Sequence, residues 1–355
     1  MSKLPIIGIS IGDINSVAVE VIIKSLVDHR LNEYCIPVVY GSSKVISFWR
    51  KNLNLPDFQL NIVKSIDQIN ARKSNIINVW EEDVEIKPGE ATELAGKYAF
   101  KALEAATNDI VEGKIHALVT APLNKNTVNT ADLRFTGHTE YLTERAGAES
   151  LMILASQDIR VALVTGHIPI GEIAQKLNKD LIISKIKLFH NSLKNDFGIN
   201  SPRIAVLGLN PHAGDNGLLG KEELEIIIPA VEQAQKEING IVFGPYPADG
   251  FFGSGQYNKF DGVLAMYHDQ GLIPFKSMAF MDGVNITAGL SFVRTSPDHG
   301  TAYSIAGKNI ANEESFRNAL YAALDILGKR NFSKEINSNP LPLTPMKRER
   351  FRIDF

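Results

Sequence analysis

The sequence predicts an α/β fold with mostly parallel sheets, arranged as two α/β/α lobes. Short apolar runs rich in β-forming residues alternate with longer amphipathic or alanine-rich segments, as in strands joined by helices that cover both faces of a parallel sheet. The chain has 355 residues, of which 44% are hydrophobic, so it can bury a core large enough for two lobes. Ligands of such folds bind beyond the carboxyl ends of the strands.

Seven apolar runs are predicted to be strands. The first, IIGISIG, follows one lysine and no small-residue cleavage site, so we expect a strand there and not a signal peptide. The predicted strands cover residues 6–12, 36–41, 75–80, 117–122, 161–167, 203–210 and 262–269. Helices are expected between them, above all at residues 91–113 and 221–240. We expect one catalytic unit over residues 1–355, with discontinuous lobes, an active-site cleft between them and a solvated tail at 340–355.

Composition favours a small substrate and a cytoplasmic location. The net charge is −3, so no nucleic acid and no anionic membrane surface is expected as a partner. No uninterrupted apolar run reaches the roughly 18 residues that a membrane span needs. The single cysteine, Cys35, excludes an intrachain disulfide and a thiolate zinc cluster within one chain, which agrees with a reducing compartment.

Two glycine patterns resemble known motifs but lack their context. GISIG, residues 8–12, matches the nucleophile elbow of serine hydrolases, yet Ser10 falls inside the apolar run and not at a strand-to-helix turn. GDNGLLG, residues 214–220, is not followed by Gly-Lys-Ser/Thr, and Gly-x-Gly-x-x-Gly is absent from the chain. The sequence therefore supports neither a serine hydrolase, nor a P-loop enzyme, nor a dehydrogenase with the Rossmann fingerprint.

Three predicted strands carry a histidine at or just past their carboxyl end. His167, His212 and His268 each follow the apolar residues of their run, so all three are expected at the carboxyl edge of the sheet. Three imidazoles brought to one rim form an open metal site that leaves coordination positions for water or substrate. Zinc or cobalt suits such ligands, and magnesium with retained water stays an alternative. Cys-x-x-Cys and His-Glu-x-x-His are both absent, so the placement alone carries this prediction.

Groups that suit an anionic substrate surround these histidines. Lysine offers a point charge and arginine a planar fork, and both bind phosphate or carboxylate. Threonine and glycine at strand-to-helix turns add backbone donors. The candidates are Lys125, His138, Thr139, Lys276, Asn285, Arg294, Asp298 and His299.

Five motifs in this order resemble one enzyme family. FTGHTEYL, GLNPHAGDNG, PADGFF, LAMYHDQGLIPFK and GVNITAGLSFVRTSPDHGTA are similar to segments of the PdxA family of pyridoxal phosphate biosynthesis, the 4-hydroxythreonine-4-phosphate dehydrogenases. The resemblance runs from the first predicted strand to about Gly307. It implies a fold similar to isocitrate and isopropylmalate dehydrogenases, which bind NAD or NADP without the Rossmann fingerprint.

The resemblance also assigns residues and a reaction. It places metal ligands on His167, His212 and His268, and substrate contacts on His138, Thr139, Lys276, Asn285 and Arg294. The implied reaction is NAD-linked oxidation of the 3-hydroxyl of 4-hydroxythreonine 4-phosphate, followed by loss of carbon dioxide to give 3-amino-2-oxopropyl phosphate. A divalent metal ion assists both steps in the implied mechanism. The family's homodimers share their active sites, so we expect a homodimer here.

The proton acceptor stays open between several side chains. Asp249 of PADGFF and Asp269 of YHDQG lie in the relevant motifs, and Lys276 is a third candidate catalytic residue. An aspartate in a turn is more often a cap, or a partner that orients a metal-binding histidine.

One stretch departs from the family. After the first strand the family usually carries Gly-Asp-Pro-Ala-Gly-Ile-Gly-Pro-Glu, whereas this chain reads GDINSVAVE from Gly12 to Glu20. Ser16 and Ala18 replace glycines that permit positive φ and a close approach of the backbone. Three alternatives therefore stay open: a dehydrogenase of threonate or erythronate 4-phosphate, a metal-dependent hydrolase or lyase, and a non-catalytic binding protein.

Overall fold

The predicted mostly parallel α/β class is confirmed. A computed structural model describes residues 4–129, 137–238 and 241–339, and in this part of the chain twelve strands form one sheet in the order β3-β4-β2-β1-β5-β12-β11-β6-β7-β10-β8-β9. The pairs β12–β11, β11–β6 and β6–β7 are antiparallel, and the other neighbouring strands are parallel.

The strands and helices have the following bounds. The strands are β1 (Ile6–Ser10), β2 (Ile36–Gly41), β3 (Asn61–Val63), β4 (Asn75–Asn78), β5 (Ala117–Thr120), β6 (Leu151–Ala155), β7 (Arg160–Leu163), β8 (Arg203–Leu207), β9 (Ile241–Tyr246), β10 (Gly262–Ala265), β11 (Val284–Ala288) and β12 (Val293–Pro297). The helices are α1 (Ala18–Leu26), α2 (Ser43–Asn52), α3 (Glu93–Val111), α4 (Lys125–Val128), α5 (His138–Ala146), α6 (Ile173–Lys176), α7 (Lys179–Asn195), α8 (Ile228–Ile238), α9 (Ala248–Gly253), α10 (His268–Met278) and α11 (Glu314–Asn337).

All seven predicted runs contain a strand, and five further strands were not predicted. The runs correspond to β1, β2, β4, β5, β7, β8 and β10, whereas β3, β6, β9, β11 and β12 are additional. Residues 91–113 contain α3, and residues 221–240 contain a π-helical turn, η5 (Glu223–Ile227), continued by α8. The last predicted strand is too long, because β10 ends at Ala265 and His268 already begins α10.

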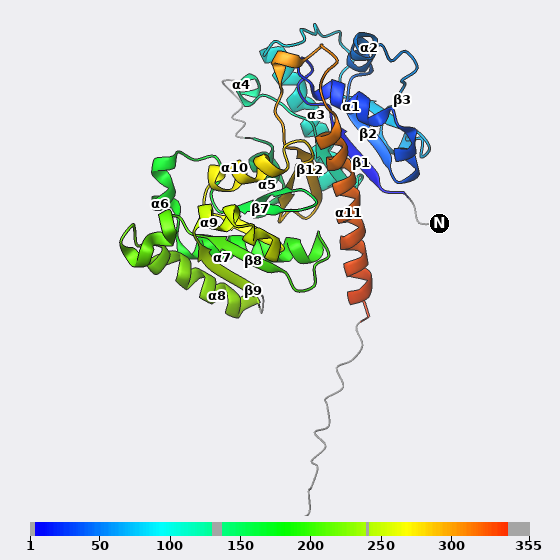
Figure 1. The fold of residues 1–355 in the computed structure, drawn as a ribbon. Coiled ribbons are helices and arrows are strands. Elements are labelled where there is room, and N and C mark those ends of the chain that lie inside the picture. The colour runs from blue at the N-terminus through cyan, green and yellow to red at the C-terminus, as the bar shows by residue number, and fades with distance from the viewer. Residues whose placement is uncertain (1–3, 130–136, 239–240, 340–355) are drawn as a thin grey trace, which may run out of the picture.

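The elements gather around the two ends of the sheet. Figure 1 shows α1, α2 and α3 with β1, β2 and β3 in one group, and α6 to α9 with β7, β8 and β9 in the other. The long helix α11 packs on β12 and β5 and contacts both α1 and α7. A single cluster of buried apolar side chains includes Ile7 and Trp49 from one end and Ile204 and Val242 from the other. The two groups therefore share one core.

Two further expectations concern membranes and the tail. No helix of the described residues is both long enough and apolar enough to cross a lipid bilayer. The predicted tail at 340–355 lies outside the described residues.

Candidate active site

A cavity of about 700 Å³ opens beyond the carboxyl ends of β5, β7 and β12. The lining includes the end of β5 and the residues after it, 120–123; Val164, Gly166 and His167 after β7; and the end of β12 with His299 and Gly300 after it. The first turn of α5 forms another wall of the cavity. The lining residues with polar chemistry include Lys125, His138, Thr139, His167, Asn285 and Arg294. Together with His299, seven of the predicted site residues are thus brought to one cavity.

Arg294 is a buried cation without an acidic hydrogen-bond partner. It lies on β12 with 3% of its surface exposed, and its guanidinium donates to Thr287 Oγ1 at 2.9 Å and to Thr120 Oγ1 at 2.6 Å. Both partners are neutral hydroxyls, and Nε has no partner among the described residues. Burial lowers the pKa of Arg294 to about 10, so the group is still charged at neutral pH. The Glu140 carboxylate at the cavity acts on this charge through space and accepts no hydrogen bond from it, so the guanidinium keeps donor capacity for an anionic ligand.

His138 lies at the cavity as a neutral imidazole. It is the first residue of α5, directly after Gly137. Burial holds its pKa well below the ordinary value of 6.5, and the nearby charges of Arg294 and Lys125 act in the same direction. The first backbone N–H groups of α5 belong to His138 and Thr139, which both line the cavity. A helix begins with unpaired N–H donors, so this end of α5 also favours an anion.

Asn285 and Lys276 approach the site from β11 and α10. The Oδ1 atom of Asn285 is buried and has no hydrogen-bond partner within the described part of the chain. Lys276 does not line the cavity among the described residues, but its Nζ lies 3.4 Å from Oδ1 of Asp298. Asp298 directly precedes His299, a lining residue. Burial raises the pKa of the Asp298 carboxyl, and the Lys276 charge opposes this shift.

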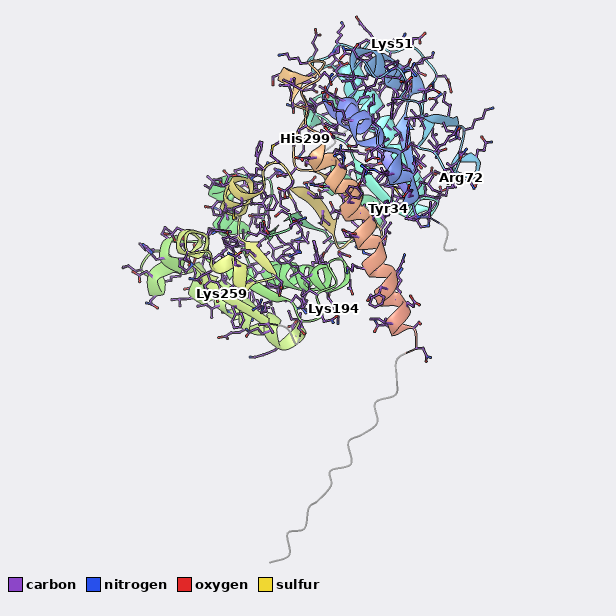
Figure 2. The ribbon with its side chains drawn as sticks, turned by 45° about the vertical axis from the view of Figure 1, so that its right-hand side comes forward. Tyr34, Lys51, Arg72, Lys194, Lys259 and His299 are labelled. Carbon is purple, nitrogen blue, oxygen red and sulfur yellow. The ribbon has the colours of Figure 1, made fainter. Side chains whose placement is uncertain are left out.

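His299 presents an unprotonated nitrogen. Its Nδ1 lies 3.0 Å from the carbonyl oxygen of Gly300, which can only accept, so Nδ1 carries the proton. Its Nε2 is buried and has no hydrogen-bond partner in the described residues. Figure 2 shows His299 between the two groups of elements, near the start of α11.

Two of the three predicted metal ligands meet. The rings of His167 and His268 lie 5.1 Å apart between centroids. Burial lowers the pKa of His167, and the charges of Lys125 and His268 lower it further, so its imidazole is neutral and keeps a free lone pair. The Nδ1 atom of His268 lies 2.7 Å from Oδ1 of Asp269. A carboxylate on one ring nitrogen is the arrangement that directs the other nitrogen of a histidine toward a metal ion.

The third predicted ligand lies apart from this pair. His212 follows β8 in the turn η4 (Pro211–Gly217) and is exposed. Across the described ranges no three His, Cys, Asp or Glu side chains are close enough to hold a metal ion. The donor chemistry of His167 and His268 nevertheless fits a zinc or cobalt ion, because both prefer imidazole nitrogen.

The two candidate aspartates have different surroundings. Asp249 is exposed in the first turn of α9 and does not line the cavity in the described part of the structure. Asp269 is bound to the ring of His268 and is 69% exposed. This contact agrees with an orienting partner for a histidine.

The altered turn from Gly12 to Glu20 lies outside the cavity lining. Asp13 accepts from the hydroxyl of Tyr303 at 2.6 Å and from the backbone N–H of Asn15 at 2.8 Å. The hydroxyl of Ser16 donates to the backbone oxygen of Asp13 and accepts from the N–H of Ala18 at the start of α1. These polar residues are buried and satisfy one another. Ser16 and Ala18 therefore fit the turn without narrowing the cavity.

Several residues of the site were not predicted. Thr120 and Thr287 hold Arg294, and Glu140 and Lys185 line the cavity. Glu140 had a weak signal, because it lies in the first turn of the helix that His138 begins. Thr120 had none, because it contacts Arg294 across 174 positions of sequence.

The fold and the cavity together define an α/β protein whose largest polar groups at the cavity are cationic or neutral hydrogen-bond donors, as in enzymes that act on small anions. The family model described as "Pyridoxal phosphate biosynthetic protein PdxA" matches residues 33–323, and the chain belongs to this PdxA family. A protein of Bacteroides thetaiotaomicron named 4-hydroxythreonine-4-phosphate dehydrogenase is 52% identical over 94% of this chain and 92% of its own length. The chain is accordingly an oxidoreductase of the dehydrogenase type.

Two further comparisons agree with this family. The crystal structure of a 4-hydroxythreonine-4-phosphate dehydrogenase from Klebsiella pneumoniae superposes with a TM-score of 0.76, at 37% identity over 92% of this chain and all of that chain. A protein of Oceanobacillus iheyensis, named as a candidate D-threonate 4-phosphate dehydrogenase, is 42% identical over 92% of this chain and 99% of its own length.

Proposed function

We propose that the protein oxidises and decarboxylates 4-hydroxythreonine 4-phosphate to 3-amino-2-oxopropyl phosphate, with NAD as oxidant and a divalent metal ion as cofactor. The observation that carries the proposal is Arg294, a buried cation that faces the cavity with neutral partners only. A phosphate or carboxylate of the substrate would accept hydrogen bonds that no carboxylate of the described residues accepts from this guanidinium. Family membership supports the substrate's identity.

The residues around the cavity have separate roles in this proposal. Arg294 and the first N–H groups of α5 bind anionic substrate oxygens, and Asn285 adds a neutral hydrogen-bonding group. Neutral His138 hydrogen-bonds to the substrate without adding charge. Lys276 does not line the cavity in the described part of the chain, but its contact with Asp298 links it to the lining residue His299. We therefore favour it over the exposed Asp249 and over Asp269, which holds His268.

The cofactors supply what the side chains do not. NAD, when bound, supplies the hydride acceptor; NADP is the alternative. The metal ion, when bound, supplies a Lewis acid for substrate oxygens. His167 and His268 would hold it, with His212 as third ligand. We favour zinc, because neutral nitrogen donors suit it better than they suit magnesium.

We also propose a cytoplasmic homodimer. Ile273 and Phe280, in and just after α10, are 64% and 72% exposed although they neighbour the predicted site residues His268 and Lys276. A second copy that covers these side chains would remove apolar surface from water and would bring residues of both chains to each site. Light scattering on the purified protein tests this directly, since a monomer at working concentrations contradicts it.

A related four-carbon substrate is the second candidate. The name of the Oceanobacillus relative points to D-threonate 4-phosphate, which lacks the amino group. Glu140 favours the amino substrate, because its carboxylate at the cavity can pair with an ammonium group. Glu140→Gln should therefore lower kcat/KM for the amino substrate and leave that for the amine-free acid nearly unchanged.

The deciding experiment follows NADH by absorbance. Purified protein receives 4-hydroxythreonine 4-phosphate or D-threonate 4-phosphate with NAD and zinc or magnesium. Turnover of the amino substrate that is lost in His212→Ala supports the proposal, and the exposed-surface variant Glu225→Gln serves as matched control. Turnover of the amine-free acid alone supports the second candidate, and no NADH from either substrate contradicts both.

A further inference from the structure

The turn that carries His212 has an unfavourable backbone conformation. His212, Ala213, Gly214, Asp215 and Asn216 have φ angles of 53°, 51°, 81°, 42° and 54°, a left-handed turn that contains a single glycine. L-residues with a Cβ atom adopt this region at a cost, and consecutive examples are rare. Such a segment persists only where surrounding contacts hold it in place.

Glu223 supplies these contacts from the first residue of η5. Its carboxylate is 1% exposed, and its Oε1 accepts from the backbone N–H groups of Leu209 and Asn210, each at 2.7 Å. Its Oε2 accepts from the side-chain amide of Asn210 at 2.9 Å. The carboxylate also packs under the turn, since a Cβ atom on Gly214 would lie 2.6 Å from Oε2. The three hydrogen-bond partners are all donors, so the site is built for a carboxylate.

The strand end that Glu223 holds is tied to the other two histidine-bearing segments. Gln270 donates to the carbonyl of Gly208 at 2.6 Å and accepts from the N–H of Met266 at 2.7 Å. Thr165, two residues before His167, donates from its hydroxyl to the carbonyl of Met266 at 2.7 Å. The ends of β7, β10 and β8 are therefore fixed relative to one another, and Glu223 adds the His212 turn to this set.

We infer that Glu223 is a positioning residue that holds the left-handed turn and thereby fixes the backbone from which the imidazole of His212 projects. The inference rests on the proposed function in one respect, the role of His212 as a metal ligand. Glu223 would then contribute to metal affinity by holding the turn and not by binding the metal itself.

Cobalt binding tests the inference in the metal-free protein. Co²⁺ is titrated into wild type, Glu223→Gln and the control Glu225→Gln, an exposed glutamate two positions further along the same helix, and the visible absorption of bound cobalt is recorded. Glutamine has one oxygen for three donors, so in either orientation its NH₂ group meets the backbone N–H groups or the side-chain amide of Asn210. Glu223→Gln should therefore bind cobalt about 10–100-fold more weakly with an altered spectrum. Glu225→Gln should stay within about twofold of wild type. Unchanged affinity and spectrum in Glu223→Gln would overturn the inference.

Amide hydrogen exchange separates this inference from the metal site itself. In metal-free Glu223→Gln the N–H groups of Leu209 and Asn210 should exchange faster than in wild type, while amides of β1 stay unchanged. Wild-type protein that binds no cobalt would overturn the metal site, whereas the exchange rates still decide whether Glu223 holds the turn. Equal rates in both proteins would overturn that role.

A rescue variant distinguishes the turn from the fold as a whole. Ala213→Gly in the Glu223→Gln background removes the Cβ atom from a residue at φ 51°, where glycine is unstrained. It should recover roughly fivefold or more of the lost cobalt affinity, or restore folding if Glu223→Gln alone is unfolded. No recovery of either would show that Glu223 acts elsewhere, and would overturn the inference.

Discussion

Arg294 has two effects that a substitution can separate: its charge attracts anions, and the burial of that charge costs stability. Methionine has a similar length and no charge, so Arg294→Met should remove the attraction for anions while relieving the cost of burying an unpaired guanidinium. We expect a loss of about 2–5 kcal/mol in transition-state binding, seen as a fall of roughly 30-fold to 5,000-fold in kcat/KM. The free protein should be as stable as wild type or about 1 kcal/mol more stable.

Thermal unfolding with and without inorganic phosphate measures both the stability of Arg294→Met and its loss of anion binding. Phosphate should raise the Tm of wild type, because a ligand that binds only the folded state stabilises it, and should leave Arg294→Met unchanged. A variant that loses stability but keeps the phosphate shift would contradict a role for Arg294 in anion binding.

His138 makes the stability of the protein depend on pH. Its folded-state pKa lies well below the ordinary 6.5, so below about pH 6.5 the unfolded chain takes up a proton that the folded protein does not. Stability from this residue is complete above that pH and falls as the pH drops toward the folded pKa. His138→Gln should flatten the decline of Tm between about pH 6.5 and pH 5. Parallel Tm profiles for the two proteins would contradict the burial of a neutral imidazole.

Site residues could be predicted where a short segment carries its own chemistry. His138 and Arg294 lie in recognisable motifs and His167 ends an apolar run, and the structure brings the three to one cavity. Thr120, Thr287 and Glu223 act on other segments through contacts that depend on which strands become neighbours and how a turn bends. No local pattern encodes those contacts.

At the scale of elements, two helical glycines should respond oppositely to the same substitution. A Cβ atom on Gly96 of α3 would lie 2.1 Å from the backbone oxygen of Thr127 in α4, whereas one on Gly328 of α11 would have no atom within 4 Å. Alanine raises helix propensity at both sites by about 1 kcal/mol. At Gly96 the clash with backbone outweighs that gain, so Gly96→Ala should lower the free energy of unfolding by about 1–2 kcal/mol. Gly328→Ala should raise it by up to about 1 kcal/mol.

The contact of α3 with α4, which Gly96→Ala disturbs and Gly328→Ala does not, also affects the candidate site. α4 begins at Lys125, which lines the cavity, so a displaced α4 moves that charge. Gly96→Ala should therefore also reduce the Tm increase given by phosphate, while Gly328→Ala keeps it. Denaturant titrations and phosphate melts on both variants decide, and a stabilised Gly96→Ala would contradict the close contact of α3 with α4.

The sequence predicted those strands whose residues are nearly all apolar. The buried parallel strands β1, β2, β5 and β8 gave clear runs, whereas β11 carries the polar residues Asn285 and Thr287 toward the site and β3 has three residues. The antiparallel hairpin of β6 and β7 also departs from the alternation on which the prediction rested. His268 begins a helix and not a strand end, since Leu272 and Phe275 repeat at the spacing of one helical face.

At the scale of the whole molecule, two groups of elements share one sheet and one core, so the protein should unfold in a single step. Both tryptophans, Trp49 and Trp80, are buried in the group around β1, and their fluorescence reports on that group alone. Far-UV circular dichroism reports on the helices of both groups. Because hydrogen bonds run unbroken from β3 to β9, the two signals should give the same midpoint in denaturant.

A variant at the junction of the two groups sharpens this test. Asp196, at the end of α7 and 4% exposed, accepts from Nε of Arg330 in α11 at 2.6 Å. Asp196→Asn weakens this pair and leaves the Arg330 charge without its partner, so it should lower the free energy of unfolding by about 2 kcal/mol. If the core is shared, both midpoints shift together by the same amount. Fluorescence and circular dichroism midpoints that separate, in wild type or in the variant, would instead show two lobes that unfold independently, and the long sheet would then be a junction between domains and not one cooperative unit.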